Sequence, residues 1–389
     1  MISIFINSLT SGGAEKVALT LHDRFRSTGN EMELFFIEKE RFYDLPEGTP
    51  VNYLSNKETL EKSWWKIPYI FLGAIRLKRQ VRKNKIPIVQ SHLPRANFTN
   101  VLARILGSRH FAQIVIHSRM NFDHQPAWKR ILSKWIFRQV FMRADSVISI
   151  CDVMKNEMDT YLGLEKHPNH RRIYNPHQLE DIRQKAAEPI DGFNFSPDKK
   201  YIIWAGRFVA RKRVGDLLEA LKIARKSFPK VELLLLGLGE EKEAMERLTE
   251  KLELTQQVHF LGYQSNPFAF IAKSDLMVIC SSMEGLPNII IESLACGTPV
   301  VSADCISGPR EILYPDSDLS QLLKDKIELG DFGILHPVGR ADLLAKALLI
   351  ILEDETLRDD YIRKGYERAA DFEAEKIGEI YLNSFPNII

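Results

Sequence analysis

Cysteine is scarce in this chain, and long apolar runs are absent from it. The 389 residues include four cysteines, Cys151, Cys280, Cys296 and Cys305, and no C-x-x-C pair. This scarcity argues against a disulfide scaffold or a structural zinc site, and we interpret the four as reduced thiols. The longest apolar run, Ile67 to Ile75, is about half the length that a bilayer span needs. Because the N-terminus also lacks a charged leader and a cleavage site, we expect a cytoplasmic protein that does not cross the membrane.

The chain also lacks an overall charge of one sign. Its 53 Lys and Arg against 51 Asp and Glu give a formal charge of +2, which argues against a nucleic-acid binder. The charge is unevenly distributed, however. Residues 1–175 carry 27 Lys or Arg against 16 Asp or Glu, or +11, which leaves 26 against 35, or −9. The two halves are therefore expected to face different partners.

The first half alternates short β-rich runs with longer segments of helical period. One helical face, for example, carries Val17, Leu21 and Phe25. Such alternation is typical of βαβ units, and the strands are apolar enough to be buried on both faces of a parallel sheet. The expected strands cover residues 2–7, 32–37, 86–91, 113–117 and 146–150, and the expected helices cover 15–25, 96–106 and 127–142.

A second alternation follows a stretch, Tyr174 to Lys200, that we interpret as a linker. It predicts strands at 201–205, 231–236, 258–261, 276–281 and 299–303, with helices near 215–228, 240–253, 266–273 and 288–296. We therefore predict an α/β protein of two Rossmann-like, doubly wound domains, 1–178 and 179–364, that face a ligand-binding cleft. The final helical stretch, Leu357 to Phe385, would pack back on the first domain from about residue 365 to 389.

Three segments have the residues of an anion or sugar site. Gly12 and Gly13 lie between the first strand and its helix, where backbone N–H groups suit an anion; a plain tight turn is the alternative. Gly206, Arg207 and Lys212 follow the strand 201–205, and the two cations suit a diphosphate, although a solvated basic loop has the same composition. The segment EGLPNIIIE, from Glu284 to Glu292, leads from a strand through a turn into a helix.

This third segment is the most informative. Pro287 suits a helix start, and the N–H groups of Asn288 and Ile289 would be first-turn donors. A diphosphate at the helix start, sugar hydroxyls at Glu284 and a ribose at Glu292 would use its polar groups. Alternatively, the two glutamates are a helix-dipole partner and a surface residue.

These motifs, in this order, resemble the retaining glycosyltransferases of family 4, which have the GT-B fold, and the match spans nearly the whole chain. It includes GGAE at residues 12–15, LLLLGLG at 233–239, VHFLGY at 258–263 and LACGTPVV at 294–301 besides the segments above. The resemblance implies that Arg207 and Lys212 bind the donor diphosphate and that Glu284 holds the transferred sugar. It further implies that Glu292 binds the ribose and that Gly13 lets the opposite domain approach the phosphate.

The remaining donor contacts are implied in the same way. Gly12, Gly206, Leu286, Pro287, Asn288 and Ile289 would line the phosphate side, and the loop from Gly262 and Tyr263 to Asn266 would receive the base. A histidine of the first domain is often important in this family, and His117, in the unusual context HSRMN, is the nearest match. His92 follows an equivalent strand and is assigned to the acceptor site. A lone histidine at a strand end is also commonly structural.

The resemblance implies a retaining transfer in which the leaving phosphate assists deprotonation of the acceptor. Fixed cations and helix N–H groups stabilise the departing charge, and no D-x-D-like pair occurs in a suitable loop, so we expect no essential metal and no cofactor. The donor would be a nucleotide-diphosphate sugar, with UDP favoured.

Two basic stretches of the first half are rich in aromatic residues and free of acids. Residues 62–85 hold Trp64, Trp65, Tyr69 and Phe71 beside eight Lys or Arg, and residues 127–143 repeat this composition. Such helices suit an anionic lipid surface, so we expect peripheral contact with the cytoplasmic face of the inner membrane and a lipid-linked or polysaccharide acceptor. Aromatics packed inside the domain are the alternative.

Two other functions fit the same scaffold. A sugar-nucleotide 2-epimerase would need no acceptor surface, and the basic first half argues against it. A membrane-associated scaffold with a decayed donor site is disfavoured because Arg207, Lys212, Glu284 and Glu292 are all present.

Overall fold

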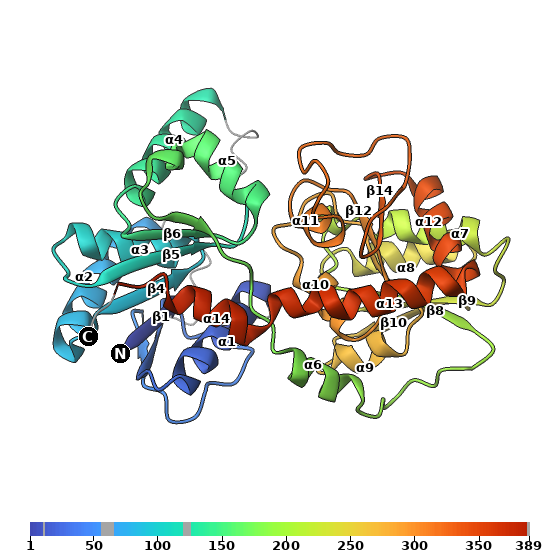
Figure 1. Ribbon diagram of the computed structural model, residues 1–389, viewed down its shortest axis with the longest axis horizontal. Helices are drawn as coiled ribbons and strands as arrows, with labels where there is room; N and C mark the ends of the chain where they lie inside the picture. The colour runs from blue at the N-terminus through green and yellow to red at the C-terminus, as the bar shows by residue number, and fades with distance from the viewer. Residues whose placement is uncertain (11, 56–65, 120–125, 387–389) are drawn as a thin grey trace. The chain divides into compact units, whose positions relative to one another are not determined.

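The chain folds into two compact units. The computed structural model describes residues 1–10, 12–55, 66–119 and 126–386. The first unit comprises Met1–His177 with Ala374–Ile389, and the second comprises Gln178–Glu373. Each unit is built on its own α/β sheet, with helices packed against it (Figure 1). The C-terminal segment thus belongs to the unit that begins the chain.

The sheet of the first unit is parallel throughout the described residues. Its seven strands have the order β3-β2-β1-β4-β5-β6-β7. All five residues of the first strand are buried, as expected where helices cover both faces of a parallel sheet. The strands are β1 (Ile2–Ile6), β2 (Met32–Phe36), β3 (Val51–Tyr53), β4 (Ile88–His92), β5 (Phe111–Ile116), β6 (Ser146–Ser149) and β7 (His170–Arg172).

Helices from both ends of the chain complete the first unit. The C-terminal helix α14 (Ala374–Leu382) packs beside α1 (Gly13–Ser27) (Figure 1). The Phe385 ring, which follows α14, makes edge contacts with the rings of Phe25 and Phe111, at centroid distances of 5.7 and 6.4 Å. Tyr381 of α14 is fully buried. The helices are α1 (Gly13–Ser27), α2 (Lys66–Asn84), α3 (Pro94–Ile105), α4 (Ala127–Phe141), α5 (Asp152–Leu162) and α14 (Ala374–Leu382), with a 3-10 turn at Leu164–Lys166.

The second unit repeats this order over five strands, and its last two strands are exchanged. Over the described residues its sheet runs β10-β9-β8-β11-β12-β14-β13, and the edge strand β13 is antiparallel. The central strands are apolar and buried, and all six residues of β9 are inaccessible. The strands are β8 (Lys200–Ala205), β9 (Val231–Leu236), β10 (Val258–Gly262), β11 (Leu276–Ile279), β12 (Val300–Ala303), β13 (Glu328–Leu329) and β14 (Ile334–His336).

The helices of the second unit form one core with its sheet. Leu217 and Leu221 of α7 share a buried cluster with Leu344 and Leu348 of α12 and with the strands. The helices are α6 (Leu179–Ala186), α7 (Val214–Ala224), α8 (Lys242–Lys251), α9 (Pro267–Ala272), α10 (Asn288–Ala295), α11 (Gly308–Leu313), α12 (Ala341–Glu353) and α13 (Glu355–Ala369), with 3-10 turns η3 (Ala210–Lys212) and η4 (Ala370–Phe372).

The two predicted doubly wound sheets are confirmed, and the structure differs from the expected details at two places. The stretch interpreted as a linker contains α6, whose Leu179 and Ile182 are buried. The final helical stretch is not continuous: α13 stays in the second unit, and the chain turns through η4, where Phe372 is fully buried, before α14 begins. The boundary therefore lies at Glu373 rather than near residue 364.

The strand order identifies where each sheet can receive a ligand. In both units the order reverses between two parallel strands, β1 and β4 in the first and β8 and β11 in the second. In open α/β sheets, ligands bind beyond the carboxyl ends of the strands at this switch point. The loops after β8 and β11 contain Lys212 and Glu284, two predicted donor-site residues that are 72 positions apart in sequence.

Candidate active site

Hydrogen bonds between main-chain groups join the loops that follow β8, β9 and β10. The Gly206 N–H donates to the Leu236 carbonyl at 2.9 Å, and the Gly237 N–H donates to the Gly262 carbonyl at 2.7 Å. Gly237 has a φ of +133°, and a Cβ there would lie 1.8 Å from the Gly206 oxygen. Only glycine allows this approach. Two predicted site residues, Gly206 and Gly262, are thus joined through the loop that follows β9.

Lys212 and Glu284 form an ion pair at the switch point of the second unit. The Lys212 Nζ lies 2.6 Å from Glu284 Oε1, and the two side chains are 18% and 12% exposed. The Ser282 N–H, which donates to the Arg211 carbonyl at 2.8 Å, ties the two loops together. The structure therefore brings together two of the predicted catalytic residues. Nearby, Arg207 is exposed, and no hydrogen bond or ion pair joins its guanidinium to another described residue.

The turn between Glu284 and α10 rests on the loop after β12. The Gly285 carbonyl accepts from the Gly308 N–H at 2.8 Å and from the Ser307 hydroxyl at 2.9 Å. A Cβ on Gly308 would lie 2.5 Å from that carbonyl, so a larger residue would displace the turn. Leu286 and Pro287 are buried, and α10 begins at Asn288, as the sequence predicts.

Glu292 lies in the second turn of α10 and is 7% exposed. It is therefore not the surface helix residue that the alternative interpretation assumed. Asn288 and Ile289, in the first turn, are half-buried. A partly buried helix start beside a lysine and a carboxylate matches the arrangement that an anionic, hydroxylated ligand requires.

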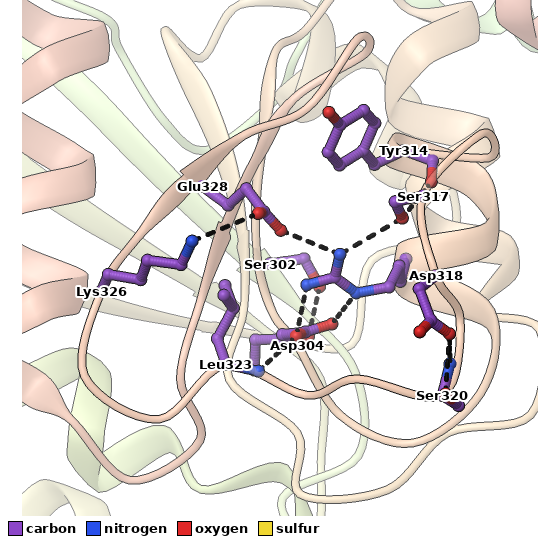
Figure 2. Close-up of polar contacts among 11 residues, drawn as sticks. Ser302, Asp304, Tyr314, Ser317, Asp318, Ser320, Leu323, Lys326 and Glu328 are labelled. Atoms are coloured by element: carbon purple, nitrogen blue, oxygen red, sulfur yellow. Dashed lines mark hydrogen bonds and ion pairs between the residues drawn. The ribbon is translucent and has the colours of Figure 1, made fainter.

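Sequence analysis did not identify the arginine that supports this turn. Arg310, in α11, donates to both carboxylate oxygens of Asp304 at 2.9 and 2.7 Å, to Glu328 at 2.8 Å and to Ser317 at 3.2 Å. Figure 2 shows Asp304, Ser317 and Glu328 converging on this guanidinium, with the Leu323 N–H donating to Asp304 at 2.7 Å. The cluster anchors the loop that contains Ser307 and Gly308. The signal in the sequence that could have pointed to Arg310 is a polar residue within SGPRE, the segment that follows a strand.

A thiol lies close to the Lys212–Glu284 pair. Burial, with added repulsion from Glu284 and Asp304, raises the pKa of Cys305 to about 12. The thiol therefore stays protonated at neutral pH, and no nucleophilic role follows for it. The four cysteines are buried and form no disulfide.

The glycine pair before α1 has a local structural reason. Glu15 is buried in the first turn of α1, where its carboxylate accepts from the Thr10 hydroxyl at 2.9 Å. A Cβ on Gly12 would lie 2.2 Å from Glu15 Oε2, so a larger residue there would displace this carboxylate. Gly13 is the first residue of the helix and is exposed. The predicted phosphate contacts of Gly12 and Gly13 remain predictions.

The two candidate histidines of the first unit lie against each other. His92 ends β4, His117 follows β5, and 2.8 Å separates His92 Nδ1 from His117 Nε2. The rings are stacked with centroids 5.1 Å apart. Burial and the neighbouring His117 hold the pKa of His92 well below its ordinary value, and burial lowers the pKa of His117 to about 3. Both are neutral at pH 7.

The loop predicted to receive the base, from Gly262 to Asn266, has an accessible tip and one residue with a structural role. Gly262 has a φ of +68° with open space around it, and Tyr263 is 49% exposed. Asn266, in contrast, caps α9 by accepting from the Phe268 N–H at 3.1 Å and donates to Lys185 and Glu188. Asn266 thus has a structural role, while the loop tip stays accessible.

Comparison with known families decides the identity of this fold. A model described as Glycosyltransferase Family 4 matches residues 11–180, and one described as Glycosyl transferases group 1 matches residues 188–368. The chain belongs to glycosyltransferase family 4. The first match covers most of the first unit and ends just inside the second, and the second match lies within the second unit of this glycosyltransferase.

Individual relatives agree with this assignment. An N-acetylgalactosamine-N,N'-diacetylbacillosaminyl-diphospho-undecaprenol 4-alpha-N-acetylgalactosaminyltransferase of Campylobacter jejuni is 29% identical over 97% of this chain and 96% of its own. An uncharacterized glycosyltransferase of Methanocaldococcus jannaschii is 33% identical, over 62% of this chain and 63% of its own. The crystal structure of HepE from Anabaena in complex with UDP has a TM-score of 0.77 at 19% identity, covering 98% of both chains, and shows the shared GT-B fold.

Within its described residues, this glycosyltransferase has neither a metal-binding cluster nor a membrane-spanning helix. Across the ranges that the structure describes, no group of three or more His, Cys, Asp or Glu side chains lies where it could hold a metal ion. Among those same residues, no helix has both the length and the apolar character of a membrane span.

Proposed function

We propose that this glycosyltransferase moves a sugar, with retention, from a UDP-sugar to a lipid-linked glycan acceptor in cell-surface glycan synthesis. The Lys212–Glu284 pair at the switch point of the second unit carries the proposal. The names of two similar proteins support its specific form, since one Campylobacter enzyme transfers N-acetylgalactosamine to a glycan carried on diphospho-undecaprenol and HepE was crystallised with UDP. We accordingly expect a hexosyl or N-acetylhexosaminyl donor.

The proposed chemistry follows from charge. Cleavage of a sugar–diphosphate bond develops negative charge on the leaving phosphate, and the cations of Arg207 and Lys212 stabilise that charge without reorganisation. Glu284 accepts from hydroxyls of the transferred sugar, and Glu292 accepts from the ribose. In the free protein, Glu284 holds the Lys212 ammonium in place.

The acceptor side is assigned to the first unit. His117 stays neutral because its pKa is about 3, so its ring can accept a hydrogen bond from a hydroxyl at physiological pH. We assign it to a substrate hydroxyl near the reacting carbon and assign Gly13 to close approach to the donor phosphate.

Lys212→Ala and Glu284→Gln test the donor site. Each removes one member of the pair, and each should lower kcat by about 10²–10³-fold, the usual loss for one electrostatic contact to the transition state. Sugar release from UDP-, GDP- and ADP-sugars is measured, together with thermal stabilisation by the free nucleotide diphosphates. Lys226→Ala removes an exposed lysine of the same unit and serves as the control. Wild-type turnover in either site variant would contradict the assignment.

The α4 helix supports a membrane-facing acceptor. One set of its apolar side chains is exposed: Trp128 is 63%, Ile131 67% and Trp135 59% accessible, whereas Phe141 is fully buried. Lys129, Arg130, Lys134 and Arg138 share the helix, and no acid does. In α2, Phe71 and Leu72 are also exposed. Trp64, Trp65 and the other residues of 62–65 lie outside the described ranges. We propose that α4 contacts the anionic cytoplasmic face of the inner membrane.

Vesicle flotation tests this contact. The protein should bind vesicles containing phosphatidylglycerol at low salt, and binding should weaken as salt screens the charges. Ile131→Ser with Trp135→Ser should abolish most of the binding, while Ile380→Ser, at an exposed apolar position of α14, should not. Equal binding by both variants would exclude α4 as the contact surface.

A further inference from the structure

A line of hydrogen-bonded side chains crosses the sheet of the first unit and ends at His117. Gln90 and Gln113 are register partners on β4 and β5, and both are fully buried. The Gln90 amide nitrogen lies 2.6 Å from Gln113 Oε1, and His92 Nε2 lies 3.1 Å from Gln90 Oε1. At the other end, Gln113 Nε2 lies 2.9 Å from the Ser384 hydroxyl. The line thus runs from the C-terminal segment to the candidate catalytic histidine.

The direction of these hydrogen bonds is determined at the Ser384 end. The Ser384 hydroxyl donates to the Tyr381 carbonyl at 2.6 Å, and a carbonyl oxygen only accepts. Ser384 therefore accepts from the Gln113 amide nitrogen, and the Gln113 oxygen is left to accept from Gln90. A second acceptor, the Ser146 hydroxyl at 3.2 Å, lies on the same side of the Gln113 amide. Both glutamine amides are oriented by this chain of donors and acceptors.

The same polarity determines which ring nitrogens carry hydrogen. Gln90 presents its oxygen to His92, so His92 Nε2 must be the protonated nitrogen of that neutral ring. His92 Nδ1 then has a lone pair, and it accepts from His117 Nε2–H across 2.8 Å. In a neutral ring this leaves His117 Nδ1 without hydrogen. Among the residues that the structure describes, none donates a hydrogen bond to His117 Nδ1, so its lone pair is the end of the line.

We propose that Gln90, Gln113 and Ser384 are positioning residues that hold His117 in its Nε2–H tautomer, so that Nδ1 accepts from a substrate hydroxyl. The part of this inference that concerns substrate rests on the proposed function, whereas the tautomer is a property of the free protein. Without the line, neutral imidazole would exchange between two tautomers, and the wrong one would present a donor instead of an acceptor. Burial keeps both rings uncharged, which supports this arrangement.

The tautomer is measured directly in the full-length protein. Long-range ¹H–¹⁵N correlation of ¹⁵N-histidine-labelled protein at pH 7 distinguishes a protonated from an unprotonated ring nitrogen, and His92→Gln and His117→Gln assign the two signals. We expect Nε2–H on both rings. In Gln90→Leu the acceptor for His92 is removed, and both signals should shift toward a mixture.

Kinetics connect the tautomer with turnover. Gln90→Leu should lower kcat about tenfold with little change in the KM for the donor, and it should have no further effect in a His117→Ala background, because a positioning residue acts only through its target. Nδ1–H on wild-type His117, or unchanged signals in Gln90→Leu, would overturn the inference without any assay of transfer. If the expected tautomer is found but His117→Ala transfers sugar normally, the substrate role given to His117 is wrong. Failure of the tautomer inference is thereby distinguished from failure of the proposed function.

Discussion

Individual buried histidines of the first unit are held neutral by their surroundings. His110 is 3% exposed, and its ring nitrogens lie 2.8 Å from the Ser108 hydroxyl and 2.7 Å from Asn100 Oδ1. Burial, with repulsion from Arg104, lowers its pKa to about 4. A proton added to this ring would place a charge in a buried site, whereas in the unfolded chain the ring is half protonated near pH 6.5.

This difference predicts an acid-sensitive contribution to stability. Because the pKa is lower in the folded state, the unfolded state binds the proton first, and stability is lost as pH falls from 6.5 toward 4. Between pH 6.5 and 5, His110 alone should remove roughly 2 kcal/mol from the free energy of unfolding. Urea unfolding at several pH values measures the slope. His110→Gln should be less stable at pH 7 but less pH-dependent, and identical slopes in the two proteins would contradict this.

At the scale of elements, the loops after β8 and β9 depend on close approach between backbones. Besides Gly237, Gly239 lies against the Phe208 backbone, where a Cβ would be 2.3 Å from the Phe208 oxygen. The Phe208 N–H in turn donates to the Leu238 carbonyl at 2.9 Å. These contacts orient the segment that leads to Arg207 and Lys212. Substitutions here should therefore affect the donor site through the loop rather than through lost charge.

Gly237→Ala is the sharpest test of this coupling. The added methyl group would overlap the Gly206 carbonyl, so the two loops must separate, and we expect loss of thermal stabilisation by UDP as well as lower stability. Gly29→Ala serves as the control, because Gly29 also has a positive φ, +85°, but has no atom within 4 Å of the added Cβ. It should cost about 1–2 kcal/mol of stability and leave nucleotide binding intact. Normal nucleotide binding by Gly237→Ala would show that the loops are independent.

On the scale of the whole molecule, the C-terminal segment is part of the first unit's core. Tyr381 is fully buried, Phe385 contacts two aromatic rings, and Gly378 lies against the Arg24 side chain of α1. The Ala374 N–H donates to the His177 carbonyl at 2.8 Å, where the chain first leaves this unit. The first unit therefore cannot complete its core until the second unit has been synthesised.

Removal of residues 374–389 should consequently destabilise the first unit and spare the second. We expect calorimetry of the truncated protein to retain one unfolding transition that UDP still raises, because the donor loops are intact, and to lose or lower the other. Tyr381→Ala should have a smaller effect of the same kind, about 3–5 kcal/mol, as for other large aromatic deletions in cores. Ile380→Ala, at a 44% exposed position, is the control. Two unchanged transitions after truncation would contradict the assignment of α14 to this core.

Many of the candidate site residues lie in short segments next to predicted strands, so they could be predicted from the local sequence. The Gly-Leu-Pro turn before Asn288 and the cations after β8 follow apolar runs that form strands, and strands of a parallel sheet end on one edge. Several short strands were not predicted: β3, β7, β13 and β14 have two or three residues each and too little pattern to be distinguished from loops. Arg310 was also missed, because its partners Asp304 and Glu328 are separated in sequence and meet only in the folded chain.

The sequence by itself determined two doubly wound sheets, the family and the candidate residues, since these depend on apolar periodicity and on motifs with short spacing. Only the tertiary structure decided that Lys212 lies 2.6 Å from Glu284, that Gln90 faces Gln113, and that α14 belongs with α1. Each of these facts depends on strand register or on the burial of residues far apart in the chain. Local preference contains no information on either, because register and burial are set by the packing of the complete core.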